Sequence, residues 1–233
     1  LSLHDALPIF PDLLRVQPDL GATDLALGSL SYRNPFPAGW TVYGRFTQMY
    51  RISYALPGVA RNGTLVAAIS VSDTTDKLGG GDITPVVGPV INLKVNGNAA
   101  QSNVSGVGTT PLLSWEPSSV GVPNGYIVTL YRLEPIPDQQ FPRSSRVATL
   151  YTTETSIVMP KDLMASGQNY CFLVRAVSQP GVDVSKTPYL VPVNQGVVRS
   201  VTAVVQAAFH DQEADDSALL ADAERHERSE EHT

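Results

Sequence analysis

The sequence has one cysteine and few charged side chains, and both shortages restrict what the protein can be. Cys171 is the only cysteine in 233 residues, which excludes an internal disulfide framework and any zinc site built on several cysteines. Charged residues make up 16% of the chain, below the usual share of about a quarter. The net charge is −6 and no stretch is strongly basic, so nucleic acid is not an expected partner. No uninterrupted apolar run approaches the length of a membrane span.

Histidines in positions suited to catalysis are also missing. His4 and His232 lie in the terminal strings discussed below, and His210 and His226 lie in or beside a polar, acidic stretch. A Ser-His-Asp triad needs a histidine that packing holds in place. We therefore expect no catalytic residue and no enzymatic activity in this chain.

Three aspartates near a glycine-rich stretch are the nearest approach to a metal site. Asp73, Asp76 and Asp82 could offer oxygen ligands to calcium, but their spacing matches no EF-hand loop. The stretch "GGGD" at 79–82 lacks the Lys-Ser/Thr of a phosphate-binding loop. We interpret residues 73–82 as part of a solvated linker, and we expect the chain to bind neither a metal nor a cofactor.

What the chain has in quantity is typical of short strands and turns. Glycine and proline occur 18 times each, and serine, threonine and valine are plentiful. Side chains alternate in character over residues 40–56, which predicts one long strand or two strands joined by a bulge at Gly44. Residues 65–73 would return antiparallel to it, and the Gly/Pro-rich stretch that follows predicts a domain boundary.

Seven short strands are expected after this boundary, over about 120 residues, which favours a β-sandwich. They are "VINLKVNG", "PLLSWEP", "NGYIVTLYRLE", "RVATLYTT", "TSIVMP", "NYCFLVRAVS" and "VVRSVTAVVQAAF".

Three of these segments together resemble a fibronectin type III domain, over residues 85–209. "LSWEP" is similar to the family's second strand and "GYIVTLYR" to its third, while "MASGQNYCFLVRAV" is similar to its tyrosine-corner segment. Met164 stands for the family's Leu, and Ser166 departs from its usual Pro. The resemblance implies an all-β, immunoglobulin-like sandwich with Trp115 at the core centre. The residues expected to build this core are Trp115, Tyr126, Val128, Gly167, Tyr170, Phe172 and Val174.

Two roles follow from the resemblance. Tyr170 would direct its hydroxyl to a backbone group upstream, and Gly167 would permit the turn before it. Cys171 would fall on the opposite face of its strand from Phe172. It is either a small apolar residue on a partly covered sheet face, or part of an apolar face that packs on the preceding domain.

The two ends of the chain are similar to translated sequencing-adapter sequence. One common short-read adapter encodes the string "LSLHDALPI" of residues 1–9, and its partner encodes the string "RSEEHT" of residues 228–233. The resemblance implies that both strings are artefacts and that residues 10–227 belong to a longer reading frame. The alternative is a genuine amphipathic N-terminus and a charged tail.

The expected organisation is therefore a β-rich fragment between two adapter-derived ends. Its segments are an adapter-derived 1–9, a truncated β-rich domain at 10–78, a Gly/Pro linker at 79–88, a fibronectin type III-like sandwich at 89–209, an acidic tail at 210–227 and an adapter-derived 228–233.

The expected function is a non-catalytic binding or spacer module of a secreted or cell-surface bacterial protein, such as a lipoprotein. The excess of Arg over Lys, with heavy use of Ala, Gly, Pro and Val, indicates a GC-rich bacterial genome. The module would adhere to a protein or glycan at the cell surface. The alternative is the accessory C-terminal region of a secreted hydrolase acting on polysaccharide or protein. A catalytic domain in the upstream reading frame would favour this alternative, and a lipoprotein signal there would favour the binding module.

Overall fold

The protein forms two compact units, Leu1–Val42 and Tyr43–Thr233. The structure is a computed structural model and describes residues 13–16, 28–29, 31–79, 81–136, 140–183, 186–187, 195–201 and 205–207. In the first unit, the ring of Phe36 stacks on Trp40 with the centroids 4.9 Å apart. The Trp40 N–H donates to the Pro37 carbonyl at 3.3 Å. Two prolines and a glycine within residues 34–40 predict this loop.

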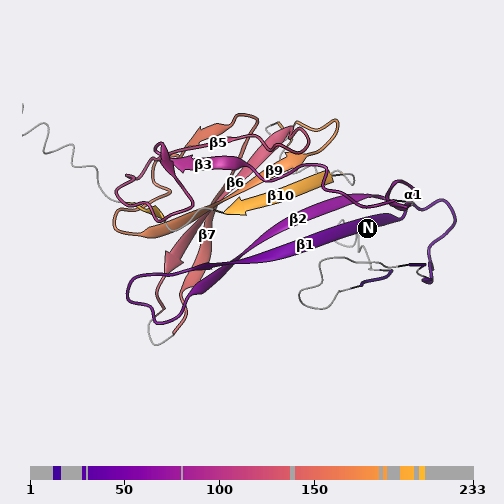
Figure 1. Ribbon diagram of the computed structural model, residues 1–233, viewed down its shortest axis with the longest axis horizontal. Coiled ribbons are helices and arrows are strands. Elements are labelled where there is room, and N and C mark those ends of the chain that lie inside the picture. The colour runs from indigo at the N-terminus through magenta and orange to yellow at the C-terminus, as the bar shows by residue number, and fades with distance from the viewer. Residues whose placement is uncertain are drawn as a thin grey trace, which may run out of the picture. The chain divides into compact units, whose positions relative to one another are not determined.

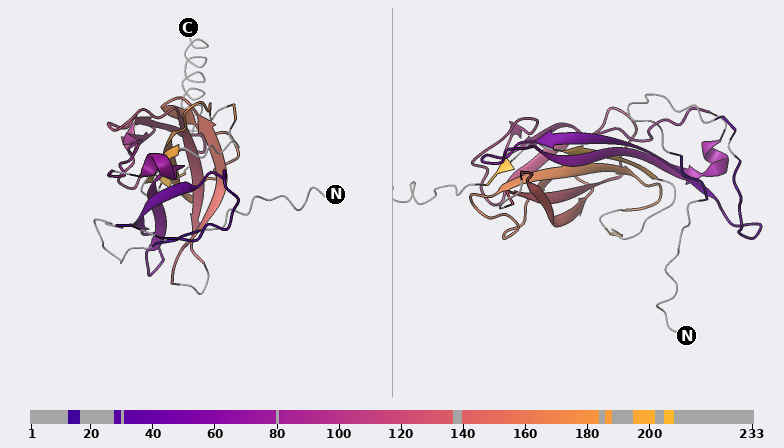
Figure 2. Two further views of the ribbon diagram at one scale, coloured as in Figure 1. Left: turned by 90° about the vertical axis from the view of Figure 1, so that its right-hand side faces the viewer. Right: turned by 90° about the horizontal axis from the view of Figure 1, so that it is seen from below.

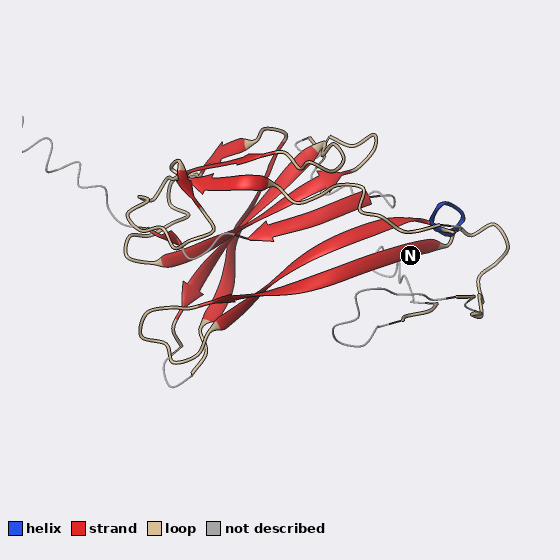
Figure 3. Cartoon of the chain, viewed as in Figure 1, coloured by secondary structure: helices blue, strands red, loops and turns tan. Residues whose placement is uncertain are grey.

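The second unit is an all-β sandwich of two antiparallel sheets (Figure 1), so the predicted fold class is confirmed at this level. The larger sheet has the order β1 (Tyr43–Tyr54), β2 (Gly63–Thr74), β10 (Gln195–Val201), β9 (Asn169–Ser178), β6 (Gly125–Glu134) and β7 (Arg143–Thr152), with β11 (Val205–Gln206) paired to β9. The smaller sheet has the order β4 (Asn98–Ala99), β3 (Ile91–Val95), β5 (Leu112–Glu116) and β8 (Ser156–Val158). Among the described residues, the helix α1 (Thr75–Leu78) has four residues and is drawn in blue in Figure 3.

Alternation of side chains along the strands explains why the two sheets face each other. In β5, Leu113 and Trp115 are buried, while Leu112 on the opposite face is 43% exposed. In β6, Tyr126, Val128 and Leu130 form the inward row. Residues of both sheets belong to one apolar cluster, because a period of two places every second side chain on the same face. This cluster is the core of the sandwich.

Most strands lie close to the predicted ranges, but the single closing strand expected from "VVRSVTAVVQAAF" is divided into β10 and β11. β1 and β2 pair in unbroken register from Tyr43–Thr74 to Tyr54–Gly63, so the bulge considered at Gly44 is absent. The sequence did not predict the two-residue strand β4 or the single turn of α1. Both elements are too short to produce a recognisable period.

The predicted domain boundary at residues 79–88 is wrong, because the hairpin belongs to the same sheet as the later strands. Residues 69–72 of β2 pair with residues 195–198 of β10. Within the expected linker, Val87 is fully buried in the core cluster and the Gly88 N–H donates to the Val120 carbonyl at 2.9 Å. The boundary between compact units falls after Val42 instead. A Gly/Pro-rich composition marks a connection, but it cannot show whether the connection joins two domains or two strands of one sheet.

The far end of the hairpin covers the outer face of the larger sheet. Tyr54, Leu56 and Leu65 form an apolar cluster with Leu133 of β6 and Cys171 of β9. Figure 2 shows the two purple strands of the hairpin lying against the orange strands of the same sheet. The hairpin therefore does two things: it extends the sheet beyond β10 and it buries part of the face that points away from the sandwich core.

Truncation of a covering side chain tests this arrangement. We expect Leu65→Ala to lower the free energy of unfolding by about 2–5 kcal/mol, the usual range for a buried leucine, because Leu65 is 7% exposed. Its neighbour Val66 is 41% exposed, so Val66→Ala is the matched control and should change stability by less than about 0.5 kcal/mol. Urea denaturation followed by circular dichroism measures both. Equal midpoints for the two variants would show that the hairpin does not cover the sheet.

Candidate functional site

The residues predicted from sequence to form the core are buried, with the exception of the turn glycine. The indole of Trp115 is 4% exposed and meets the ring of Tyr126 edge to face, with the centroids 5.2 Å apart and the planes at 65°. Val128, Phe172 and Val174 are at most 1% exposed. Edge-to-face contact is a favoured geometry for aromatic pairs and adds to the stabilisation from burial.

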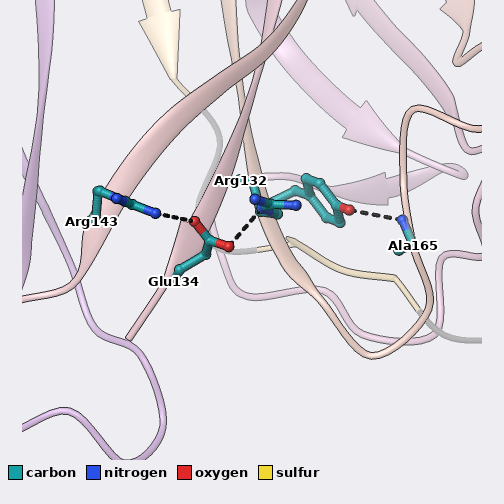
Figure 4. A network of polar contacts seen from close by, with 5 residues as sticks. Arg132, Glu134, Arg143 and Ala165 are labelled. Atoms are coloured by element: carbon teal, nitrogen blue, oxygen red, sulfur yellow. Dashed lines mark hydrogen bonds and ion pairs between the residues drawn. The ribbon is translucent and has the colours of Figure 1, made fainter. Parts of the chain in front are cut away.

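Tyr170 closes the turn that precedes its own strand. Its hydroxyl accepts a hydrogen bond from the Ala165 N–H at 2.8 Å (Figure 4), while its ring is 1% exposed. Gly167 lies on the surface of this turn with φ +74°, and its N–H donates to the Ala207 carbonyl at 2.7 Å. The left-handed backbone there favours glycine, because a side chain would strain it. Gly167 thus shapes the turn rather than filling the core.

Figure 4 also shows a surface network at the end of β6. The carboxylate of Glu134 lies 2.9 Å from Arg132 and 3.2 Å from Arg143. Arg143 is 61% exposed, so solvent screens its charge and the pair contributes little to stability. The network links the ends of two adjacent strands, β6 and β7.

Cys171 is buried on the outer face of β9 and is 1% exposed. Burial raises the pKa of its thiol from 9.0 to about 12, so the thiol stays protonated at neutral pH and is a poor nucleophile. The pKa of Tyr54 is raised as well, mainly by burial and to a smaller extent by the nearby Cys171. Residues that precede the expected linker do cover this face, but they belong to the same compact unit and not to a preceding domain.

Two of the three aspartates lie at one pocket. Asp73 and Asp82 line a cavity of about 290 Å³ beside α1, together with Lys77 and Ser178; Asp76 is not part of the lining. The Asp73 carboxylate accepts the Thr74 N–H at 2.7 Å and lies 3.5 Å from the Lys77 ammonium. The Asp73 carboxylate therefore already has partners within the protein, which makes it less available as a calcium ligand.

His4, His210, His226 and His232 lie outside the described residues. Within the ranges that are described, no three His, Cys, Asp or Glu side chains gather as they do around a metal ion. No helix in those same ranges is both long enough and apolar enough to cross a membrane.

One structural residue was missed from the sequence. Asn124 stands just before β6, and its side-chain amide donates to the carbonyls of Gln179 at 2.5 Å and Val182 at 2.8 Å. Its side-chain oxygen accepts the Gln179 N–H at 2.8 Å. Asn124 thereby fixes the loop after β9, which lines the pocket through Pro180. "NG" before a strand predicts a turn, but nothing local predicts a partner so far along the chain.

Comparison with known proteins does not assign the chain to a family. No protein-family model matches it, and a search of curated proteins finds no match.

Replacement of the central indole tests the core assignment. We expect Trp115→Ala to lower the free energy of unfolding by about 3–5 kcal/mol, as large aromatic truncations generally do. Trp40, which is 62% exposed in the first unit, provides the matched control. Trp40→Ala should leave the unfolding of the sandwich within about 0.5 kcal/mol of the parent protein. Urea melts with an unchanged midpoint for Trp115→Ala would contradict the assignment.

The raised pKa of Cys171 predicts a loss of stability in alkali. Between pH 9 and pH 12 the unfolded thiol releases its proton while the folded thiol keeps it. The free energy of unfolding should therefore fall with pH, by up to about 1.4 kcal/mol per unit. Cys171→Ala removes this contribution and retains every other ionising group, so the difference between the two proteins isolates it. Denaturation under reducing conditions across this range measures the effect, and parallel curves would contradict it.

Proposed function

We propose that residues 85–209 form a fibronectin type III-like module that acts in a secreted or cell-surface bacterial protein as a non-catalytic binding or spacer unit. The observation that supports the proposal best is the hydrogen bond from the Ala165 N–H to the Tyr170 hydroxyl, together with the burial of Trp115. These are the positions and roles that the resemblance implies. A sandwich closed in this way is a rigid carrier, and its loops and edges are free to bind.

The loop between β5 and β6 is a candidate contact for such a role. Val122 is 83% exposed and Val120 is 49% exposed at its tip. The loop is nevertheless held in place: the Val120 N–H donates to the Ser118 hydroxyl at 2.9 Å and the Val120 carbonyl accepts the Gly88 N–H at 2.9 Å. Exposed apolar side chains on a fixed loop suit binding, because little conformational entropy is lost on contact.

A second candidate is the accessory region of a secreted hydrolase acting on polysaccharide or protein. The pocket beside α1 supports it, because Thr84 and Ser178 line this pocket together with Asp73 and Asp82. Groups of this kind are suited to hydrogen bonding with sugar hydroxyls. The two candidates differ in the ligand they require, a surface protein or glycan in the first case and the hydrolase substrate in the second.

A binding panel separates the candidates. The full chain, immobilised, would be tested against surface proteins and against cellulose, chitin, starch and peptidoglycan. We expect saturable binding that Val122→Asp weakens about tenfold or more, the effect of roughly 1.4 kcal/mol at a contact. Val158 is also exposed, at 59%, but lies on β8, so Val158→Asp is the matched control. Binding confined to one hydrolase substrate would favour the accessory role, and no saturable binding would contradict a binding module.

A further inference from the structure

Among the described strands, one long edge strand of the sandwich is neither shortened nor interrupted by a bulge. Sheet edges expose unpaired N–H and C=O groups, and proteins usually protect them by shortening the strand or by introducing a bulge. In the smaller sheet the edge strands β4 and β8 have two and three residues. At one end of the larger sheet, β7 carries an irregularity in its register with β6 between Leu130 and Tyr131. At the other end, β1 runs for 12 residues in unbroken register with β2.

The free side of β1 offers a regular template. Because β1 pairs only with β2 among the described strands, about every second residue directs its backbone N–H and C=O away from the sheet. Side chains on the strand are open to solvent as well: Met49 is 67% exposed and Tyr50 is 43% exposed. An added strand would therefore gain backbone hydrogen bonds and apolar contact together.

The charges on this edge are all of one sign. Arg45 and Arg51 are exposed on the same face of β1, and the strand has no acidic residue. The register places Arg45 opposite Ser72 and Arg51 opposite Val66, so neither arginine has a carboxylate directly opposite it on β2. Among the described residues, neither arginine forms an ion pair. The positive charge of both side chains is available to an incoming strand.

The same charges oppose pairing with a second copy of the chain. Antiparallel pairing of two β1 strands about Gln48 would place Arg45 of each copy opposite Arg51 of the other. Like charges directly opposite one another destabilise a strand pair. This register is therefore disfavoured for a second copy, whereas the same two positions favour a strand of opposite charge.

We propose that the free edge of β1 binds an extended segment of another protein that carries two carboxylates six residues apart. This spacing places one carboxylate opposite Arg45 and the other opposite Arg51, on the same face of the added strand, whether it runs parallel or antiparallel. The inference rests on the proposed function as a binding module and specifies the surface and the chemistry of its partner.

Peptides of matched sequence test the proposal on the full chain. The probe is TEVTVTVET, with its two glutamates six residues apart, and the control is TKVTVTVKT. We expect the glutamate peptide to bind the parent protein at least about tenfold more tightly than the lysine peptide, since two attractive cross-strand pairs become repulsive. Binding should also weaken as salt is raised. Fluorescence anisotropy of labelled peptides measures the affinities.

Charge reversal on the protein completes the test. The double variant Arg45→Glu with Arg51→Glu should lose the glutamate peptide and bind the lysine peptide instead. Arg146→Glu, on the exposed face of the other edge strand β7, is the matched control and should behave as the parent protein. An unreactive Cys171 in DTNB labelling checks that each variant retains its hairpin. Equal affinity for both peptides, no affinity for either, or unchanged preference in the double variant would overturn the proposal.

The result is distinguishable from failure of the proposed function. If neither peptide binds while the protein still binds in the panel of surface proteins and glycans, only the edge inference fails. If both experiments are negative, the binding module itself is contradicted. Self-association of the parent protein in sedimentation velocity, lost in the double variant, would identify the edge as an interface between copies and would also overturn the proposal.

Discussion

The rest of the structure depends on a strand that is apolar on both faces. β9 runs through the larger sheet with Phe172 and Val174 on one side and Cys171 and Val177 on the other, all at most 1% exposed. Each row needs its own cover, since leaving such side chains in water would cost much of the hydrophobic stabilisation. One row packs on the smaller sheet, and the other requires elements from elsewhere in the chain.

Two separate segments supply the cover on the outer face. The end of the first hairpin lies over Cys171 and Leu133, while the loop after β9 places Val182 over Val177. Asn124 fixes that loop through three hydrogen bonds. This explains why the hairpin is part of the sandwich unit and not a neighbouring domain: without it, one face of a central strand would be exposed. It also explains the protonated, shielded state of Cys171.

The arrangement leaves binding to the periphery of the sandwich. Its core is filled by side chains from both sheets, and the one cavity described above, beside α1, lies at the end of β2. The remaining distinctive surfaces are a fixed loop with exposed valines and a long regular strand edge with two arginines. The loop and the edge are both held by the rigid sandwich, and on such surfaces a small number of side chains can supply most of the binding energy.

Local patterns predicted much of the fold and little of the candidate site. Alternation in "LLSWE" and "YIVTL" correctly indicated strands and buried Trp115 and Tyr126, because a period of two is a property of the strand itself. The continuous apolar run "YCFLV" indicated that β9 is buried on both faces, but it could not say what covers each face. The resemblance to a known family directed attention to Tyr170 and Gly167, whose roles in the turn agree with what it implied.

The sequence by itself determined the strands, their inward rows and the all-β class, since these follow from the chemistry of neighbouring residues. Only the tertiary structure decided that residues 69–72 pair with residues 195–198, and this pairing removes the predicted boundary and leaves β1 at the edge. The physical reason is that strand pairing is a contact between segments far apart in the chain. Any strand offers the same backbone groups, so the choice of partner depends on how the whole core packs.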